Sequence, residues 1–273
     1  MKSKTVTVNE QGDLTYITFP KLTQCGAVRH IFSTRHGGVS EGQFATMNLS
    51  FRNGDDRQKV RRNYEILCAA AGISTDHLVL TRQTHTANIQ TVTAADCGTG
   101  YSKPDFSDID GLITAEPNVA LVTQFADCTP VLLCDPVKKV IANVHAGWRG
   151  TVQNIGGIAV ERMVAEFGCR REDILAAIGP CVGVCCYEVD DPVYEAFVPL
   201  GIETGRVLTA TRNGHYQLDL KLANRLLLEK SGVLSENIDV SDFCTCCLAE
   251  DFHSHRATAG KRGNLAAIIE LKA

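Results

Sequence analysis

Two short apolar runs near the middle of the chain give the clearest signal in the pattern of hydrophobic and polar residues. They cover residues 120–125 and 140–144. Both runs are too short and too rich in β-branched residues for helices, so each predicts a buried strand. Cys128 follows the first run and His145 follows the second. We therefore expect a thiol and an imidazole to face a crevice where two strands end.

The segment after His145 predicts a turn and then a helix. Residues 146–150 contain two glycines, and an apolar helical period follows over residues 151–167. His145 thus lies between a strand and a turn that leads into a helix N-terminus. This order suits an anion or nucleotide site. Residues 55–72 predict the clearest helix, with an aspartate as N-cap and Gly72 as the terminating glycine.

The remaining pattern predicts more strands than helices. Further strands are expected at residues 15–19, 28–34, 78–84, 112–115, 131–134, 174–178 and 265–271. Further helices are expected at residues 191–197 and 219–230. Helices are too few for a regular βαβ alternation, so we expect an α+β fold, with layered mixed β-sheets flanked by helices. No linker-like stretch interrupts the chain, which predicts a single domain over residues 1–273.

Composition narrows the possible partners and compartment. The chain has 273 residues, 44% of them hydrophobic, and a net charge of −4. This balance predicts no binding to nucleic acid or to an anionic membrane. The N-terminus lacks the apolar region of a signal peptide, so we expect a soluble, cytoplasmic protein. Its 12 cysteines are then expected to be thiols, metal ligands or catalytic groups rather than disulfides.

Three other positions are candidates for site residues. His85 follows the strand expected at residues 78–84, although a single histidine there is more often structural. Arg35, beside the Gly37-Gly38 turn, and Arg149, at a predicted helix start, are candidates for an anion site. Asn48 interrupts an apolar run, which indicates a hydrogen-bonding role.

Two features of the C-terminal half, a basic loop and a pair of cysteine groups, allow more than one interpretation. A basic loop at residues 253–262 precedes an expected edge strand, and it either closes over a nucleotide or is a solvated hairpin. Two cysteine groups have spacings unlike common closed zinc sites: Cys181, Cys185 and Cys186, and Cys244, Cys246 and Cys247. Buried thiols and a single zinc per chain are expected, with a second, thiolate-rich site from both groups as the alternative.

The motifs of the chain resemble the laccase-domain family, also called the multicopper polyphenol oxidase or peptidoglycan editing factor family. The matching motifs are TRxGGVS at residues 34–40, MNL at 47–49, QTH at 83–85, ADCxP at 126–130, HAGWRG at 145–150, IGP at 178–180, CCYEV at 185–189 and FHSHR at 252–256. The resemblance implies a purine nucleoside phosphorylase with adenosine deaminase activity. It also implies a zinc site formed by His85, Cys128 and His145.

The implied substrates are adenosine, inosine or guanosine, and methylthioadenosine, which phosphate cleaves to free base and ribose 1-phosphate, or its methylthio derivative in the last case. Two nitrogen ligands and one sulfur ligand leave one position on zinc for water or substrate. A zinc-bound water attacks the purine ring in deamination. The chain departs from the family pattern after Arg256, where relatives more often read RRDGxTGR, so ligand contacts of that loop are not carried over.

Two other functional classes remain alternatives. A copper-dependent polyphenol oxidase needs more closely paired histidines than the 8 present provide. A metal-free hydrolase would use Cys128 as nucleophile and a histidine as base on peptidoglycan-type amides. The preferred nucleoside and the oligomeric state do not follow from the sequence.

Overall fold

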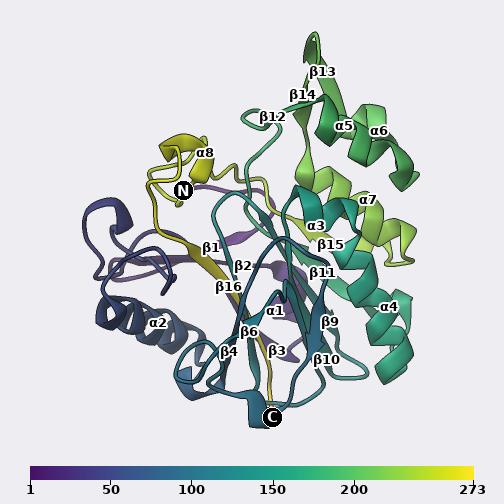
Figure 1. The fold of residues 1–273 in the computed structure, drawn as a ribbon. Helices are drawn as coiled ribbons and strands as arrows, with labels where there is room; N and C mark the ends of the chain where they lie inside the picture. Colours follow the sequence, from purple (N-terminus) through teal and green to yellow (C-terminus); the bar gives the residue numbers. More distant parts are fainter.

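Two large mixed β-sheets stacked face to face form the centre of the protein (Figure 1). The computed structural model describes all 273 residues. The seven-stranded sheet has the order β1 (Thr7–Gln11), β2 (Leu14–Thr18), β3 (Val28–Ser33), β16 (Leu265–Leu271), β8 (Ala120–Phe125), β4 (Leu78–Arg82) and β6 (Phe106–Ser107). The six-stranded sheet has the order β15 (Ile238–Val240), β11 (Leu175–Ile178), β9 (Thr129–Asp135), β10 (Val140–Ala146), β7 (Gly111–Thr114) and β5 (Ile89–Thr91).

Apolar side chains on both faces of the central strands produce the layering. In β16, Leu265, Ala267 and Ile269 join the core between the two sheets. Ala266 and Ile268 of the same strand join the outer core of the first sheet. Successive strand residues point to opposite faces, so a strand that is apolar at every position is covered on both sides.

Helices cover the outer faces of the two sheets and complete four layers. α2 (Arg57–Ala71) packs on the seven-stranded sheet, and α4 (Ile155–Phe167) and α7 (Leu220–Lys230) pack on the six-stranded sheet. A small third sheet, with β12 (Glu188–Asp190), β14 (His215–Leu218) and β13 (Leu208–Arg212), projects beyond the layers (Figure 1). The other helices are α1 (Pro20–Gln24), α3 (Trp148–Val152), α5 (Asp191–Phe197), α6 (Thr204–Val207) and α8 (His255–Thr258). None of the helices has the length and apolar content that a membrane span requires.

The expected fold class, with layered mixed sheets flanked by helices, is confirmed. The strand at residues 120–125 and the helix at 191–197 have the predicted bounds. α2 begins after the N-cap Asp56 and ends at Gly72, which has φ 66° as a terminating glycine requires.

Two predictions about secondary structure are wrong. The helix expected at residues 151–167 is divided into α3 and α4, because Asn154 adopts a left-handed conformation and its side chain caps α4 at the Gly157 amide. The last strand, expected at an edge, lies between β3 and β8 and is buried at every position. Its near-continuous apolar sequence is typical of such a central strand.

Asn143 in β10 links the two sheets through hydrogen bonds in the core. Its side-chain amide donates to the carbonyl oxygens of Leu121 and Ala267, both at 2.9 Å. Its side-chain oxygen accepts from the Thr123 hydroxyl at 2.7 Å. Asn143 is fully buried, so water cannot replace these partners.

Replacing Asn143 with Ala is therefore expected to lower the free energy of unfolding by about 2–4 kcal/mol, because buried polar partners lose their bonds and a cavity remains. Urea denaturation followed by circular dichroism measures this change. Gln90→Ala, at an exposed position on β5, is the control and is expected to change stability by less than about 0.5 kcal/mol. Equal stability of the Asn143 and Gln90 variants would contradict the assigned role.

Candidate active site

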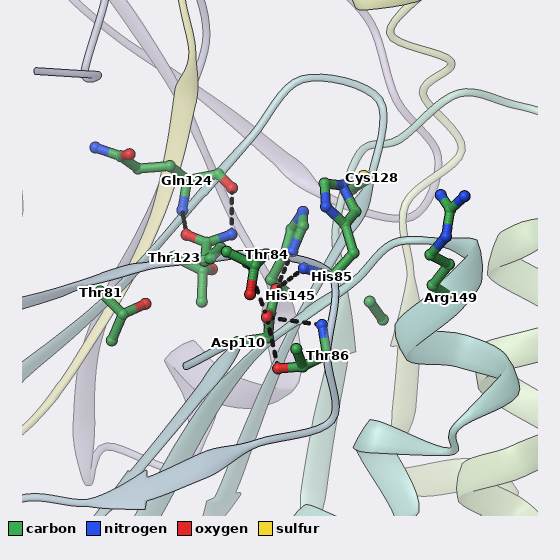
Figure 2. Close-up of polar contacts among 12 residues, drawn as sticks. Thr81, Thr84, His85, Thr86, Asp110, Thr123, Gln124, Cys128, His145 and Arg149 are labelled. Atoms are coloured by element: carbon green, nitrogen blue, oxygen red, sulfur yellow. Dashed lines mark hydrogen bonds and ion pairs between the residues drawn. The ribbon is translucent and has the colours of Figure 1, made fainter. Parts of the chain in front are cut away.

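His85, Cys128 and His145 come together at one edge of the two sheets (Figure 2). His85 follows β4, Cys128 lies between β8 and β9, and His145 is near the end of β10. β9 and β10 are paired such that Ala146 lies opposite Thr129, which brings Cys128 close to the turn after His145. The three potential ligand atoms lie within 4.8 Å of one another. The structure thus brings together the three residues that the family resemblance implied.

Asp110 fixes two of these candidate ligands, although no sequence pattern predicts a role for it. Its Oδ1 accepts hydrogen bonds from His145 Nδ1 at 2.9 Å and from the His85 amide at 3.0 Å. Its Oδ2 accepts from the amides of Thr84 and Thr86 at 3.1 and 2.8 Å and from the Thr86 hydroxyl at 2.9 Å (Figure 2). The carboxylate is fully buried. Since Nδ1 of His145 is bonded to Asp110, Nε2 is left for a ligand.

The backbone around the group is also specialised. His85 has φ 65° and Asp127 has φ 88°, which are uncommon values for residues other than glycine. The amide bonds to Asp110 hold the first of these conformations in place. At Gly147, a Cβ would lie 2.9 Å from His85 Cδ2 and 3.0 Å from Cys128 Sγ. Glycine at this position therefore permits the close approach of the β10 turn to the two ligands.

The charges of the group shift its pKa values. Burial opposes ionisation of Cys128, but the charges and hydrogen bonds of His145 and His85 outweigh it and lower the pKa of the thiol to about 6. Burial likewise opposes the charged form of His145, but Cys128 and Asp110 outweigh it and raise its pKa to about 9. Hydrogen bonds and charge from His145, with the Thr84 and Thr86 amides, overcome burial and lower the pKa of Asp110 to about 2. The group thus favours a thiolate beside an imidazolium.

The donor atoms fit a zinc ion. In a tetrahedral site, a sulfur at about 2.3 Å and a nitrogen at about 2.0 Å from the metal lie about 3.5 Å apart. Cys128 Sγ and His85 Nε2 are separated by 3.7 Å. Two imidazoles and one thiolate form a set that zinc accepts with one position open. The bond from His145 Nδ1 to a carboxylate is the usual support of a zinc-bound histidine.

Two cavities meet at this group. The larger has a volume of about 400 Å³ and is lined by His85, Ala126, Asp127, Cys128, Trp148, Val182, Tyr187, Leu220, His255, Arg256 and Arg262. The smaller has a volume of about 170 Å³ and is lined by Ser50, Arg52, Asn53, Gln83, His85, Gln124, Phe125, Ala126, Cys128, His145, Arg262 and Asn264. His85, Cys128 and Arg262 border both cavities. The candidate metal ligands therefore lie between an aromatic compartment and a polar one.

The structure does not bring Arg35 or Asn48 into these cavities. The Arg35 guanidinium donates to the carbonyl oxygens of Ala45 and Ala249. Asn48 is fully buried, and its side chain forms hydrogen bonds with Ser50, Asp55 and Asn264. The Gly38 amide, in the turn beside Arg35, donates to the Thr46 hydroxyl. We assign Arg35 and Asn48 to the support of loops rather than to substrate contact.

Arg149 lies on α3, outside the residues that line either cavity (Figure 2). Its guanidinium stacks on Trp148 at 4.3 Å from the ring centroid, and Trp148 does line the larger cavity. Arg149 therefore contacts a wall of the cavity from outside and does not itself offer charge to a ligand within it.

The basic C-terminal loop supplies both arginines of the larger cavity. Arg256 and Arg262 both line the larger cavity, which favours ligand closure over a solvated hairpin. Arg256 stacks over Tyr187 at 5.3 Å, and its amide donates to Asp127 Oδ2 at 2.6 Å. The sequence predicts a basic loop here but favours Arg35 and Arg149 for the anion site, because only the folded chain shows that residue 262 returns to Cys128.

The expectation of buried thiols is wrong for Cys185 and Cys247, and the two cysteine groups lie together rather than apart. Cys185, Cys186, Cys244 and Cys247 place their sulfur atoms within 4.8 Å of one another. Cys185 and Cys247 are exposed. Strand pairing explains the meeting, because β11 and β15 are parallel neighbours and each is followed by one cysteine segment.

Comparisons with known proteins show which sequences and structures this chain resembles. Residues 29–272 match the sequence family described as multi-copper polyphenol oxidoreductase laccase. The chain is 38% identical to the protein named purine nucleoside phosphorylase YlmD of Bacillus subtilis, over 88% of this chain and 87% of that protein. It is 42% identical to the purine nucleoside phosphorylase of Deinococcus radiodurans, over 90% of each. The crystal structure of YlmD from Geobacillus stearothermophilus matches with a TM-score of 0.92 and 35% identity, over 97% of this chain and 99% of that one.

Asp110→Asn is expected to weaken zinc binding about 10- to 100-fold, because an amide cannot accept all the bonds that the carboxylate accepts and no longer orients His145. Competition with a chelator of known affinity measures this loss. The exposed Asp108→Asn is the control from the same segment and is expected to bind zinc as the parent does. Unchanged zinc affinity in a folded Asp110→Asn protein would show that His85 and His145 need no such support.

Proposed function

The chain belongs to the family described as multi-copper polyphenol oxidoreductase laccase, and on that premise we propose that it is a zinc-dependent purine nucleoside phosphorylase. One domain over residues 1–273 cleaves adenosine, inosine and guanosine with phosphate, giving free base and ribose 1-phosphate, and cleaves methylthioadenosine to adenine and 5-methylthioribose 1-phosphate. The same site deaminates adenosine. The observation that carries the proposal is the position of His85, Cys128 and His145 between an aromatic cavity and an arginine-bearing polar cavity.

The larger cavity suits the purine base. Trp148 and Tyr187 provide aromatic surface, and Val182 and Leu220 provide aliphatic surface. A flat heteroaromatic ring stacks favourably on such side chains. A volume of about 400 Å³ is also within the usual range for small-molecule sites. The base therefore lies on the Trp148 and Tyr187 side of the metal ligands.

The smaller cavity suits phosphate and the ribose hydroxyls. Arg52 and Arg262 bring positive charge, and Gln83, Asn53 and Asn264 bring polar side chains. Arg262 is partly buried, and burial lowers its pKa from the ordinary value, as expected for a cation removed from water. A buried guanidinium gains from a bound anion more than an exposed one does. Arg262 is therefore the main phosphate-binding residue in this proposal.

Phosphorolysis then takes place where the two cavities meet. A phosphate oxygen forms a bond to ribose C1′, the bond from C1′ to purine N9 breaks, and its electron pair leaves with the base. Arg262 holds the phosphate, while the Trp148 and Tyr187 walls hold the base, so the two reactants are aligned. Zinc, when bound by His85, Cys128 and His145, supplies a Lewis acid with one open position. In deamination, water adds to purine C6 and ammonia leaves.

The donor groups do not favour a multicopper oxidase. The chain forms two groups of three or more potential ligands, one with two histidines and one with cysteines alone. Coupled copper centres in oxidases need many histidines close together.

A specific observation does favour a second candidate, the metal-free hydrolase of peptidoglycan-type amides. Cys128, with its lowered pKa, lies with His145 and Asp110 in the order of a nucleophile, a base and an orienting carboxylate.

We expect purified protein to release base from inosine, adenosine and methylthioadenosine only when phosphate and zinc are present. Chromatography of the bases and of ribose 1-phosphate gives the readout. Cys128→Ala is expected to lose activity by at least about 1000-fold, because it removes a ligand of the metal. Cys97→Ser, which changes a partly exposed thiol away from the cavities, is the control.

Equal release of base with and without phosphate would show that the protein is a nucleoside hydrolase rather than a phosphorylase. Activity on amides that survives removal of zinc by a chelator would support the metal-free hydrolase. No reaction of folded, zinc-loaded protein with any of the nucleosides would contradict the proposed function.

Arg262→Ala is expected to raise the KM for phosphate about 10- to 100-fold, because a charge-assisted hydrogen bond contributes about 1.5–3 kcal/mol. Steady-state kinetics with varied phosphate measures the change, and Arg262→Lys should restore part of it. Arg149→Ala is the matched control, since Arg149 is exposed and lines neither cavity. A larger increase in the KM for phosphate in Arg149→Ala than in Arg262→Ala would instead support an anion site at the start of α3.

A further inference from the structure

A second cluster of ligand atoms lies beside the larger cavity. Cys185 and Cys186 belong to the segment that connects β11 to β12, and Cys244 and Cys247 belong to the segment after β15. β11 and β15 run parallel, with Ile178 opposite Val240 at their ends. The chains leaving two parallel neighbours start from the same edge of the sheet, so the cysteine segments meet there.

The sulfur geometry matches four ligands of one ion. Four sulfurs at about 2.3 Å from a tetrahedral metal lie about 3.8 Å apart. Cys247 Sγ is 3.3 Å from Cys185 Sγ and 3.4 Å from Cys186 Sγ, and all four sulfurs lie within 4.8 Å of one another. A covalent disulfide would be much shorter, at about 2.05 Å. An iron–sulfur cluster would hold its cysteine sulfurs around several atoms and therefore further apart.

The backbone around Cys244 is arranged to support a thiolate. The amides of Gly183 and Cys247 donate to Cys244 Sγ at 3.1 and 3.4 Å. A Cβ at Gly183 would lie 3.2 Å from both Cys185 Sγ and Cys244 Sγ, so a glycine lets the loop approach the sulfurs this closely. Cys244 and Cys247 form a C-x2-C turn, the spacing that supplies two ligands in many zinc sites. Because Cys246 also lies inside that turn, the C-x2-C spacing is not obvious from the sequence.

Exposure excludes the simpler explanation that these cysteines only fill space. Cys244 is buried, but Cys185 and Cys247 are exposed and Cys186 is partly exposed. Cysteines that act as small hydrophobic residues are among the most buried in proteins. Thiolates are soft ligands that select zinc, copper(I) or iron–sulfur clusters, and a closed set of four is the usual structural zinc site.

We propose that Cys185, Cys186, Cys244 and Cys247 bind a second zinc ion, which holds the 179–187 loop to the segment after β15. All four thiols bind as thiolates, so their protons are released when the metal enters. The site has no open position and takes no part in the reaction. It replaces the expectation of a single zinc per chain.

This second zinc supports the walls of the larger cavity. The 179–187 loop contributes Val182 and Tyr187 to the cavity lining. Within the C-x2-C turn, the Thr245 hydroxyl donates to Asp127 Oδ1 at 2.5 Å, and Asp127 precedes Cys128. Asp127 also accepts from the Arg256 amide, and its carbonyl oxygen accepts from the Val182 amide. The cysteine site therefore connects to the cavity through both the loop and Asp127.

The number of zinc ions per chain tests the proposal. Folded protein is equilibrated with zinc, excess zinc is removed, and the bound metal is measured by mass spectrometry. The parent is expected to hold about two zinc ions, and Cys247→Ser and Cys128→Ala about one each. Cys246→Ser, one residue away in the same turn, should keep two. Cobalt in place of zinc should show the intense thiolate absorption of a four-sulfur site, and this band should be lost in Cys247→Ser.

Alkylation of the parent protein provides a test that does not depend on the folding of a variant. Zinc should protect Cys185 and Cys247 from iodoacetamide, and a chelator should expose both, while the reactivity of Cys97 should not change with metal. One zinc in the parent and in Cys247→Ser alike would overturn the proposal. Reaction of Cys185 and Cys247 regardless of zinc, or a native disulfide between them, would also overturn it. These readouts are independent of nucleoside turnover.

Discussion

The buried carboxylate of Asp110 is the interaction on which the candidate active site depends. A carboxylate without contact to water is costly unless its oxygen atoms are fully bonded. Here one oxygen binds His145 and the His85 amide, and the other binds the Thr84 and Thr86 groups. The same bonds that compensate burial also fix both histidines. A single residue before β7 thus orients ligands that arrive from β4 and β10.

The sheet topology determines what surrounds this group. Pairing of β9 with β10 brings Cys128 to the turn after His145, and the central position of β16 returns Arg262 to the same edge. The parallel pair β11 and β15 directs two cysteine segments to the neighbouring wall. The candidate metal ligands, the arginines and the cysteine cluster therefore meet at one edge, although they come from distant parts of the sequence.

The features that the sequence predicts are those set by local patterns. The buried strand at residues 120–125 and the capped helix α2 follow from periodicity and end signals. The ligands His85, Cys128 and His145 were assigned by resemblance to a family, because strand ends alone do not show which residues meet. The roles of Asp110, Arg262 and the cysteine cluster depend on strand order and on parallel pairing. In the sequence Asp110 only precedes a glycine and a predicted strand, and no local signal distinguishes it from a solvated aspartate.

The proposed reaction centre is defined by the atoms that bind zinc in the group held by Asp110. X-ray absorption at the zinc edge of Cys247→Ser, which in our proposal retains this site alone, reports the atoms bound to the ion. We expect two imidazole nitrogens, one sulfur and one further light atom. A shell without sulfur, or with several sulfurs, would contradict the assignment of His85, Cys128 and His145 as the reaction centre.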